Sequence, residues 1–559
     1  MATAHFRSLA GLLAALAGVI LLASMLPPDA RHVRGGVKAV PVITPRTTGA
    51  GGVELRMDIP PGTLVRYTLD GTDPGPFSPV YAAPFVPGGT RHAEQLAAVP
   101  TSLQWRHPVH DPLHGVLVKA RCCNAEGGMG PVVSRTVLPM AHGGLPVFAL
   151  TVDEDGFFGQ ERGIYVVGQA IFGLDKQALL RLPRDHKWWK YPGNFNWRGK
   201  RAERRARLDR FAPGAPADAS PEWSAEVGVR INGNNSRGFP QHALRLILDE
   251  PLDAPLFGPG HGTGHRRLLL RTAGNDMDHA FFRDALQHRL CEGLPFTTSA
   301  CTQSVLYING AYWGVHNLRE RVDAKELARR HGLRAKDITI IEDRMALYEG
   351  DEDQLKVFSW LLGKAEQWDA GTPAFVDSLE RRLDVDGFLN YMAAQIILAN
   401  TDWPEQNLKW WRWTGVPDTL GAPGDGRWRF IMTDSDLGMG LTVQADYDMF
   451  AHIDRHAAVP VVRLLKACLR SEALRDRFAR ILDELVVGPL SAERMTAEAR
   501  RMRDAIAAEM PAHIGRWRRP GSVSAWERHV EDLLTFAARR PAAVKEQSAP
   551  WLARLPLHR

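Results

Sequence analysis

The chain changes its hydrophobic pattern along its length, from the alternation of strands to the periodicity of helices. Between residues 53 and 320 the apolar residues come mostly in short strand-like runs, with one helical stretch predicted near Met277–Glu292. From about Val322 onward they recur at helical spacing, and the last hundred residues read as amphipathic helices. The pattern predicts an α+β protein. Its 559 residues are enough for about two to four domains with real cores.

The first 28 residues have the composition of a targeting element. The run Leu9–Leu26 is apolar except for small residues, with Arg7 before it and two prolines after it. About 18 residues is the lower limit for a membrane-spanning helix and long for a signal peptide. We expect residues 1–28 to be a signal anchor or a cleaved signal peptide, with the body outside the cytoplasm, in the periplasm or extracellular space. Residues 29–52, rich in Gly, Pro and Thr, are expected to be a linker.

Charge and cysteine content exclude some classes of protein and leave others open. A net charge of +6 is small for this length, so composition gives no case for a nucleic-acid partner. The basic run at residues 198–210 is interpreted as a solvated helix face. Cys291 and Cys301 are spaced so that they can pair, and five buried free thiols is the equally weighted alternative. Neither a Ser/His/Asp elbow nor a metallopeptidase HExxH motif is present.

The segment from Asn400 to Met439 contains the candidate catalytic and metal-binding side chains. Asp402 precedes Asn407 by five residues, and a strand-like run then delivers Asp434 and Asp436 into a turn that contains glycine. Phosphoryl transfer with Mg²⁺ needs a carboxylate to orient a hydroxyl, together with an amide and a second carboxylate to hold the metal on the phosphates. The alternative is that these side chains cap helices and fill turns.

A short stretch of the first β region resembles a known accessory domain. Residues 65–74 read VRYTLDGTDP and are followed by Ser78-Pro-Val-Tyr81, a pattern similar to the chitobiase/β-hexosaminidase C-terminal-type domain. The resemblance implies a small β-sandwich over residues 53–140. We expect this domain to act as a spacer, and contact with a glycan is the less favoured interpretation.

Four stretches in the same chain order resemble the CotH kinase family, the spore-coat or secreted atypical protein kinases. They read LPVFALTVD with GIYV at residues 145–166, GVRINGNNSRGFP at 228–240, a helix followed by VLYINGAYWGVHNLRER at 268–321, and the Asn400–Met439 segment. The resemblance implies a kinase-like domain over residues 145–460 with a helical C-terminal extension at 461–559.

The resemblance also implies roles for individual residues. Asp402 takes the position of the catalytic loop, and Mg²⁺ would be held by Asn407 and Asp434, with Asp436 close by. Which of the two aspartates coordinates is open, with Asp434 preferred. The residues expected to bind ATP are Arg230, Gly233, Asn234, Ser236, Arg245 and Glu320.

One departure from the family pattern keeps alternatives open. The family commonly reads P-K-K-S after the glycine-containing loop, whereas this chain has Gln241 and His242 in place of the lysines. Three hypotheses therefore compete: a Mg²⁺-dependent kinase that phosphorylates Ser or Thr of an exported protein at the cell envelope, an inactive kinase-fold scaffold for an envelope partner, and an envelope carbohydrate-binding protein.

Overall fold

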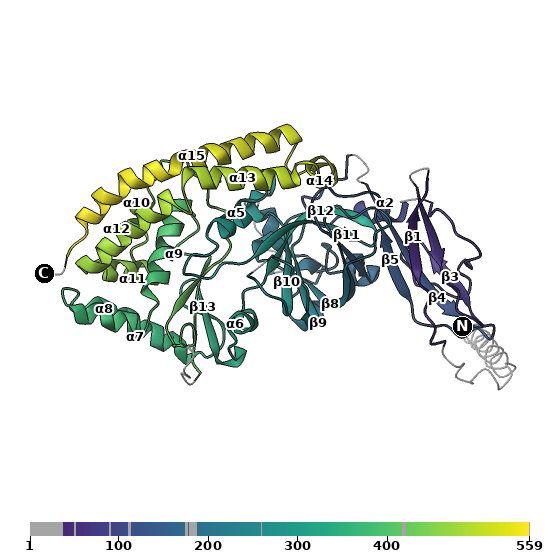
Figure 1. Cartoon of the computed structure of the whole chain (residues 1–559), viewed down its shortest axis with the longest axis horizontal. Coiled ribbons are helices and arrows are strands. Elements are labelled where there is room, and N and C mark those ends of the chain that lie inside the picture. The colour runs from purple at the N-terminus through teal and green to yellow at the C-terminus, as the bar shows by residue number, and fades with distance from the viewer. Residues whose placement is uncertain are drawn as a thin grey trace, which may run out of the picture. The chain divides into compact units, whose positions relative to one another are not determined.

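The structure is a computed structural model that describes residues 37–49, 52–88, 91–109, 113–170, 172–173, 177, 187–258, 260–415 and 421–557 (Figure 1). The predicted anchor or signal peptide, residues 1–28, lies outside the described residues. Within the described ranges, no helix combines the length and the apolar character needed to span a membrane.

The chain divides into two compact units. The smaller unit comprises Met1–Pro87 and Val118–Arg135, and the larger unit comprises Gly88–Leu117 and Thr136–Arg559. The chain therefore leaves the smaller unit after residue 87, contributes residues 88–117 to the larger unit and re-enters the smaller unit at residue 118, which the sequence pattern did not indicate.

The smaller unit contains a two-stranded and a three-stranded antiparallel sheet. Strand β1 (Ile43–Thr47) pairs with β2 (Val53–Met57), and β4 (Val116–Cys123) lies between β3 (Leu64–Thr68) and β5 (Val133–Val137). The turn after β3 has the geometry expected of its sequence. Gly71 has a φ of 76°, and Asp70 Oδ1 accepts hydrogen bonds from the backbone N–H and hydroxyl of Thr72 at 3.1 and 2.6 Å.

The larger unit begins with a closed barrel in the order β10-β12-β11-β6-β7-β8-β9 (Figure 1). Leucines at alternate positions fill its interior; Leu244, Leu246, Leu268 and Leu270 are all fully buried. The residues between them point outward, because successive side chains of a strand face opposite sides. The strands are β6 (Val147–Val152), β7 (Arg204–Phe211), β8 (Trp223–Ile231), β9 (Leu244–Leu252), β10 (His265–Arg271), β11 (Cys301–Ile308) and β12 (Ala311–Glu320).

After the barrel the chain forms a second, four-stranded antiparallel sheet and then a helical region. The sheet has the order β14 (Ala346–Glu349), β13 (Ile338–Glu342), β15 (Leu408–Trp413), β16 (Arg429–Met432). Three tryptophans of β15, Trp410, Trp411 and Trp413, are buried, so they belong to the core.

The helices after the barrel are amphipathic or buried, as the periodicity predicts. In Figure 1, α13 and α15 lie side by side. The helices are α6 (Ala324–His331), α7 (Asp353–Gln367), α8 (Pro373–Glu380), α9 (Val385–Leu398), α10 (Met449–Arg455), α11 (Pro460–Cys468), α12 (Glu472–Val487), α13 (Ala492–Ala507), α14 (Met510–Trp517) and α15 (Val523–Arg554).

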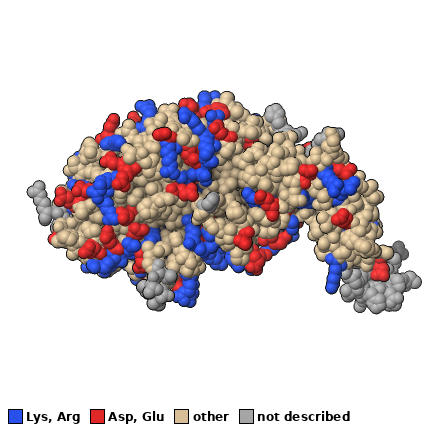
Figure 2. Space-filling view, viewed as in Figure 1, with Lys and Arg blue, Asp and Glu red and all other residues tan. Residues whose placement is uncertain are grey.

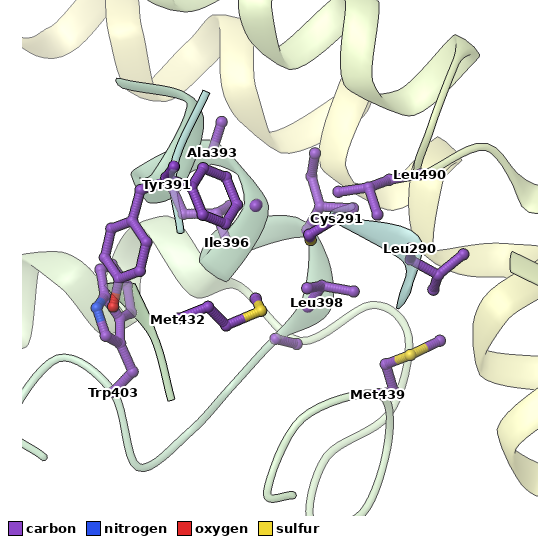
Figure 3. Packing of buried hydrophobic residues seen from close by; sticks show 14 of the residues in the cluster. Leu290, Cys291, Tyr391, Ala393, Ile396, Leu398, Trp403, Met432, Met439 and Leu490 are labelled. Carbon is purple, nitrogen blue, oxygen red and sulfur yellow. The ribbon is translucent and has the colours of Figure 1, made fainter. Parts of the chain in front are cut away.

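Helix α9 is the centre of the helical core. It is apolar on nearly every side, which is typical of a helix packed all round by other elements. Figure 3 shows Tyr391, Ile396 and Leu398 of this helix packed with Cys291 and Met432 from other elements. The core therefore fixes the end of α9 and the start of the loop that follows it.

Four details differ from the sequence interpretation. Residues 43–47 of the expected linker form strand β1, because they pair with β2. The helix expected at Met277–Glu292 is shorter, because residues 274–278 form a 3₁₀ turn and α5 spans only Arg283–Leu290. Most of the basic run at residues 198–210 belongs to strand β7 and not to a helix, since Ala206 and Leu208 point into the barrel. All five cysteines are buried free thiols, so Cys291 and Cys301 do not pair.

Figure 2 shows acidic and basic groups interspersed over the visible face of the larger unit.

Candidate active site

Asp402 and Asn407 are brought together by the loop that follows α9. The helix ends with Ala399 in the left-handed conformation, φ 50°, and the loop then returns so that the Asn407 side-chain amide donates to Asp402 Oδ2 at 3.1 Å. Burial raises the pKa of Asp402, and the negative charge of Asp434 raises it further. Asn407 also has a positive φ of 60°, a conformation that non-glycine residues adopt mainly where the fold imposes it.

Asp434 is the accessible carboxylate of the acidic pair. It lies two residues beyond β16 with a φ of 44°, and its side chain is 48% exposed. Its Oδ1 accepts a hydrogen bond from Arg271 Nη2 at 2.5 Å. Burial acts to raise the pKa of Asp434, but the Arg271 guanidinium outweighs this effect and holds the pKa below its ordinary value. Asp434 is therefore ionised at neutral pH and faces open space.

Asp436 is held in place and not left open. Its side chain is only 3% exposed, and both oxygens accept hydrogen bonds from Asn275: Oδ2 from the backbone N–H at 2.9 Å and Oδ1 from the side-chain amide at 3.1 Å. Burial, and then the charge of Asp434, raises the pKa of Asp436 to about 7. Of the two aspartates, Asp434 is the one with room for a ligand.

Behind the acidic pair lies a buried carboxylate, that of Asp284, which contacts several groups of the site. Asp284 of α5 forms an ion pair with Arg319 of β12, and its Oδ2 lies 3.3 Å from Arg271 Nε. Its Oδ1 accepts a hydrogen bond from the backbone N–H of Ser435, between the two aspartates, at 2.8 Å. The sequence analysis missed Arg271, Asp284 and Arg319. Nothing in their local sequence separates them from other charged residues, because they meet only in the fold.

Except for Asp284, which lies behind them, these groups line one cleft in the larger unit, with a volume of about 560 Å³. Its wall includes all but one of the site residues predicted from the sequence, and Arg230 is the exception. The predicted residues that line it are Gly233, Asn234, Ser236, Arg245, Glu320, Asp402, Asn407, Asp434 and Asp436.

The glycine-containing loop between β8 and β9 forms one edge of the cleft. Gly233 has a φ of 105°, and buried Arg237 fixes the loop by donating to the carbonyl groups of Gly233 at 2.8 Å and Ile231 at 2.6 Å. Asn234 Oδ1 accepts a hydrogen bond from Arg198 Nη2 at 3.1 Å. The loop is thus held by its own buried arginine, with Gly233, Asn234 and Ser236 on the cleft side.

Arginines of the barrel form a row across its outer face. Arg230 of β8 lies opposite Arg245 of β9 in the strand register. Leu269 of β10 lies opposite both Arg245 and Arg319 of β12, so the row continues to Arg319. Arg230 is neutralised by Glu203, whose Oε2 lies 2.8 Å from its Nε. By contrast, no carboxylate among the described residues pairs with Arg245, whose one hydrogen bond goes to Asn232 at 3.3 Å.

Arg245 keeps its charge in this setting. Burial, with a smaller contribution from Arg321, lowers the pKa of Arg245 to about 10, which leaves the guanidinium protonated at neutral pH. A charged, partly buried arginine without a carboxylate partner is suited to bind an anion that enters the cleft.

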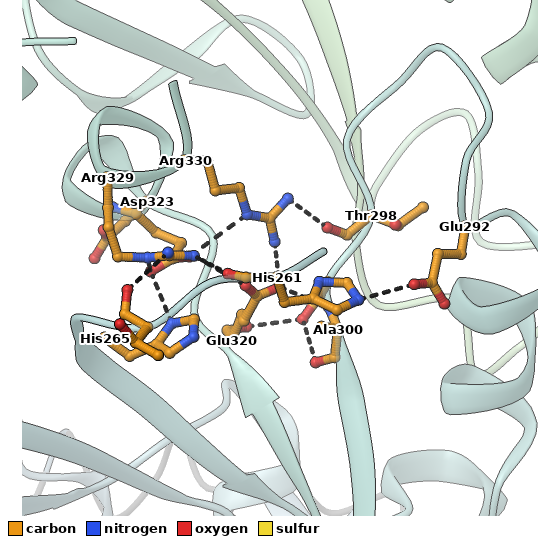
Figure 4. Close-up of polar contacts among 12 residues, drawn as sticks. His261, His265, Glu292, Thr298, Ala300, Glu320, Asp323, Arg329 and Arg330 are labelled. Atoms are coloured by element: carbon orange, nitrogen blue, oxygen red, sulfur yellow. Dashed lines mark hydrogen bonds and ion pairs between the residues drawn. The ribbon is translucent and has the colours of Figure 1, made fainter. Parts of the chain in front are cut away.

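Glu320 lines the cleft but is fully engaged with protein groups (Figure 4). It pairs with Arg330 and with Arg329, whose Nη2 lies 3.3 Å from Oε1, and it accepts the backbone N–H of Ala300 at 2.8 Å. Ligand atoms of Glu320, Glu326 and His265 lie within 4.8 Å of one another, a spacing that would suit a metal. The two arginines already neutralise both carboxylates, so this cluster is a structural ion-pair network.

The two positions that depart from the family pattern, Gln241 and His242, do not line the cleft. The Gln241 amide donates to the carbonyl groups of Trp313 at 3.2 Å and Val315 at 3.1 Å. His242 is fully buried, its Nε2 lies 3.1 Å from the Thr101 carbonyl oxygen, and burial lowers its pKa to about 3. The identity of these side chains therefore removes no cation from the cleft wall.

The far side of the cleft contains further residues that the sequence analysis missed. Asp343, with a φ of 51°, accepts the backbone N–H of Leu408 at 3.3 Å. The Lys409 ammonium lies 3.3 Å from the centre of the Tyr348 ring and 3.4 Å from Glu342. These residues lie in or next to the short strands β13, β14 and β15, where a lone polar residue gives no signal in the sequence.

Comparison with known proteins identifies a family for most of this unit. A family model described as CotH kinase protein matches residues 229–544, more than half of the chain. No curated protein matches the chain. The solved structures that match include the crystal structure of a Helicobacter pylori proinflammatory kinase, CtkA, with 10% sequence identity, coverage of 56% of this chain and 94% of that chain, and a TM-score of 0.26.

Proposed function

Since this chain belongs to the CotH kinase protein family, we propose that its cleft binds a nucleotide with Mg²⁺ and transfers the γ-phosphoryl group to a Ser or Thr hydroxyl of a protein. One observation carries the proposal. Asp402, Asn407 and Asp434, which come from a helix-end loop and a strand-end turn, line the same cleft, and the charge of Asp434 acts on Asp402.

The donor set fits Mg²⁺. Asn407 uses its amide N–H on Asp402, which leaves its side-chain carbonyl oxygen for a ligand, and Asp434 is ionised and half-exposed. Mg²⁺ prefers such oxygen ligands, keeps several waters and needs few protein groups. When bound there, the ion would neutralise the charge of the nucleotide phosphates.

The residues of the chain perform the remaining steps of the proposed reaction. The acceptor hydroxyl oxygen attacks the γ-phosphorus, the bond from that phosphorus to the β-phosphate oxygen breaks, and Asp402 takes the hydroxyl proton. The raised pKa of Asp402 makes it a better proton acceptor than an ordinary aspartate. Arg245 and the backbone of the Gly233–Ser236 loop bind phosphate oxygens at the barrel edge.

The inactive scaffold remains the alternative; the two side chains that motivated it, Gln241 and His242, are buried and do not line the cleft. The location and partners remain proposals that rest on the sequence. We propose an envelope protein anchored or exported through residues 1–28, with an exported protein as substrate. The likeness of residues 53–140 to the chitobiase-type domain, with its glycan contact, also stays a prediction, since the family model begins at residue 229.

The first test is Mg²⁺-dependent nucleotide binding by the full chain, measured by calorimetry with a non-hydrolysable ATP analogue. Asp434→Asn should lose the part of the affinity that depends on Mg²⁺, whereas Asp402→Asn should keep it. Asp249→Asn is the matched control, since Asp249 pairs with Arg205 at the barrel surface outside the cleft. Binding that is absent in the wild type, or equal in all three variants, would contradict the proposal.

A further inference from the structure

Arg271 is the cation of the acidic site and is bound by carboxylates from different elements. It is the last residue of β10, and its side chain is 19% exposed. Its Nη2 lies 2.5 Å from Asp434 Oδ1 and 3.7 Å from Asp436 Oδ2, while its Nε lies 3.3 Å from Asp284 Oδ2. The guanidinium therefore spans the candidate metal ligand on one side and a buried carboxylate on the other.

The two ends of this guanidinium differ in how firmly they are held. At the Nε end, Asp284 is fixed by Arg319 and by the backbone N–H of Ser435. At the Nη2 end, Asp434 is half-exposed and faces the cleft. The Nη2 end can thus exchange its partner while the Nε end stays in place, because an arginine presents several donors in a planar fork.

We propose that Arg271 is a positioning residue that competes with the divalent cation for Asp434 and, once displaced from it, binds a phosphate oxygen of the nucleotide through Nη2. This inference rests on the proposed function of the cleft. Nη2 occupies Oδ1 of Asp434, and a cation bound to the same half-exposed carboxylate competes with the guanidinium for its charge. The displaced guanidinium then needs a new anion, and a phosphate in the cleft supplies one.

The arrangement couples the two ligands. Cation binding frees Arg271 for phosphate, and phosphate binding draws Arg271 away from Asp434, so each ligand favours the binding of the other. Such coupling is reciprocal by thermodynamic linkage. It predicts that Arg271 weakens the binding of metal alone and strengthens the binding of nucleotide alone.

The test uses the full chain with two separate probes, Mn²⁺ alone followed by electron paramagnetic resonance, and ATP in EDTA followed by calorimetry. An adjacent opposite charge shifts a carboxylate by roughly 1–3 pKa units, so Arg271→Gln should bind Mn²⁺ about tenfold or more tightly than the wild type. The same variant should bind metal-free ATP about tenfold more weakly, since a charge-assisted hydrogen bond is lost.

Two further variants control the test. Arg245→Gln removes one positive charge from the same cleft without a contact to Asp434, so its Mn²⁺ affinity should stay close to the wild-type value. Arg271→Lys keeps the charge but cannot span Asp434 and Asp284, and it should bind Mn²⁺ about threefold more tightly. This variant decides the question if Arg271→Gln does not fold.

Mn²⁺ binding that is unchanged or weaker in the Arg271 variants, or equally tightened by Arg245→Gln, would overturn the inference. Failure of the proposed function would look different. In that case the wild type would transfer no phosphoryl group, although the Mn²⁺ and ATP shifts of the Arg271 variants were as expected.

Discussion

Gly274 is the residue whose replacement should disturb the acidic site most sharply. It has a φ of +64°, and a Cβ added there would lie 2.2 Å from Asp436 Oδ2. The left-handed conformation costs an alanine about 1–2 kcal/mol. Displacement of Asp436 would break a hydrogen bond between a carboxylate and Asn275, which is worth about 1.5–3 kcal/mol. Gly274→Ala should therefore lower the free energy of unfolding by about 2.5–5 kcal/mol and weaken Mn²⁺ binding.

Gly332, after α6, provides a matched control for this prediction. Its φ is +66°, nearly the same, but a Cβ there meets no atom within 4 Å. Gly332→Ala should lower the free energy of unfolding only by the cost of the left-handed backbone conformation, about 1–2 kcal/mol, and leave Mn²⁺ binding unchanged. Urea unfolding at pH 8 and Mn²⁺ titration of both variants give the comparison. Equal losses of stability together with equal metal affinities would refute the proposed geometry around Asp436.

Three other predictions follow from the same contacts. Gln241→Lys should lower the free energy of unfolding by about 2–4 kcal/mol without improving ATP affinity in calorimetry, because it buries a charge and breaks two hydrogen bonds to carbonyl groups. Arg245→Gln should weaken Mg²⁺–ATP binding about tenfold or more at unchanged melting temperature, and equal binding would remove Arg245 from the site. Burial lowers the pKa of His242 and His513 to about 3 and of His316 to about 4. Since these values lie below the unfolded pKa, the contribution of the three histidines is complete above about pH 6.5 and falls by about 4 kcal/mol between pH 7.5 and 5.5, while the raised pKa of Asp436 acts in the opposite direction and offsets part of this loss. Urea unfolding curves that coincide at the two pH values would contradict this.

The sequence predicts the fold where its hydrophobic pattern is unambiguous. Leu244 and Leu246 of β9, and Leu268 and Leu270 of β10, alternate with outward-facing residues, so these two strands are predicted from their sequence pattern. The prediction of a helix at residues 204–210 is wrong because the arginines mask the alternation of Ala206 and Leu208, which face the barrel interior. The pairing order of the strands, and the inclusion of residues 88–117 in the larger unit, depend on contacts between distant segments that no local pattern encodes.

The acidic half of the candidate site was predictable, because Asp402, Asn407, Asp434 and Asp436 lie close together in one segment. The basic half was not. Arg271 gains its role only from Asp284 and Asp434, which are separated from it by 13 and by 163 residues along the chain. For the same reason, the family pattern drew attention to Gln241, whose side chain the fold directs into the protein interior.

The central claim is that this cleft transfers a phosphoryl group, and the most direct measurement follows γ-labelled ATP with the full chain and a Ser/Thr-rich acceptor protein. We expect label to appear on Ser or Thr in the presence of Mg²⁺, and to be lost in Asp402→Asn although this variant still binds the Mg²⁺–nucleotide complex. Label should also be lost in Asp434→Asn together with the Mg²⁺-dependent binding. Transfer that persists in both variants, or a wild-type protein that binds no Mg²⁺–nucleotide complex, would contradict the account.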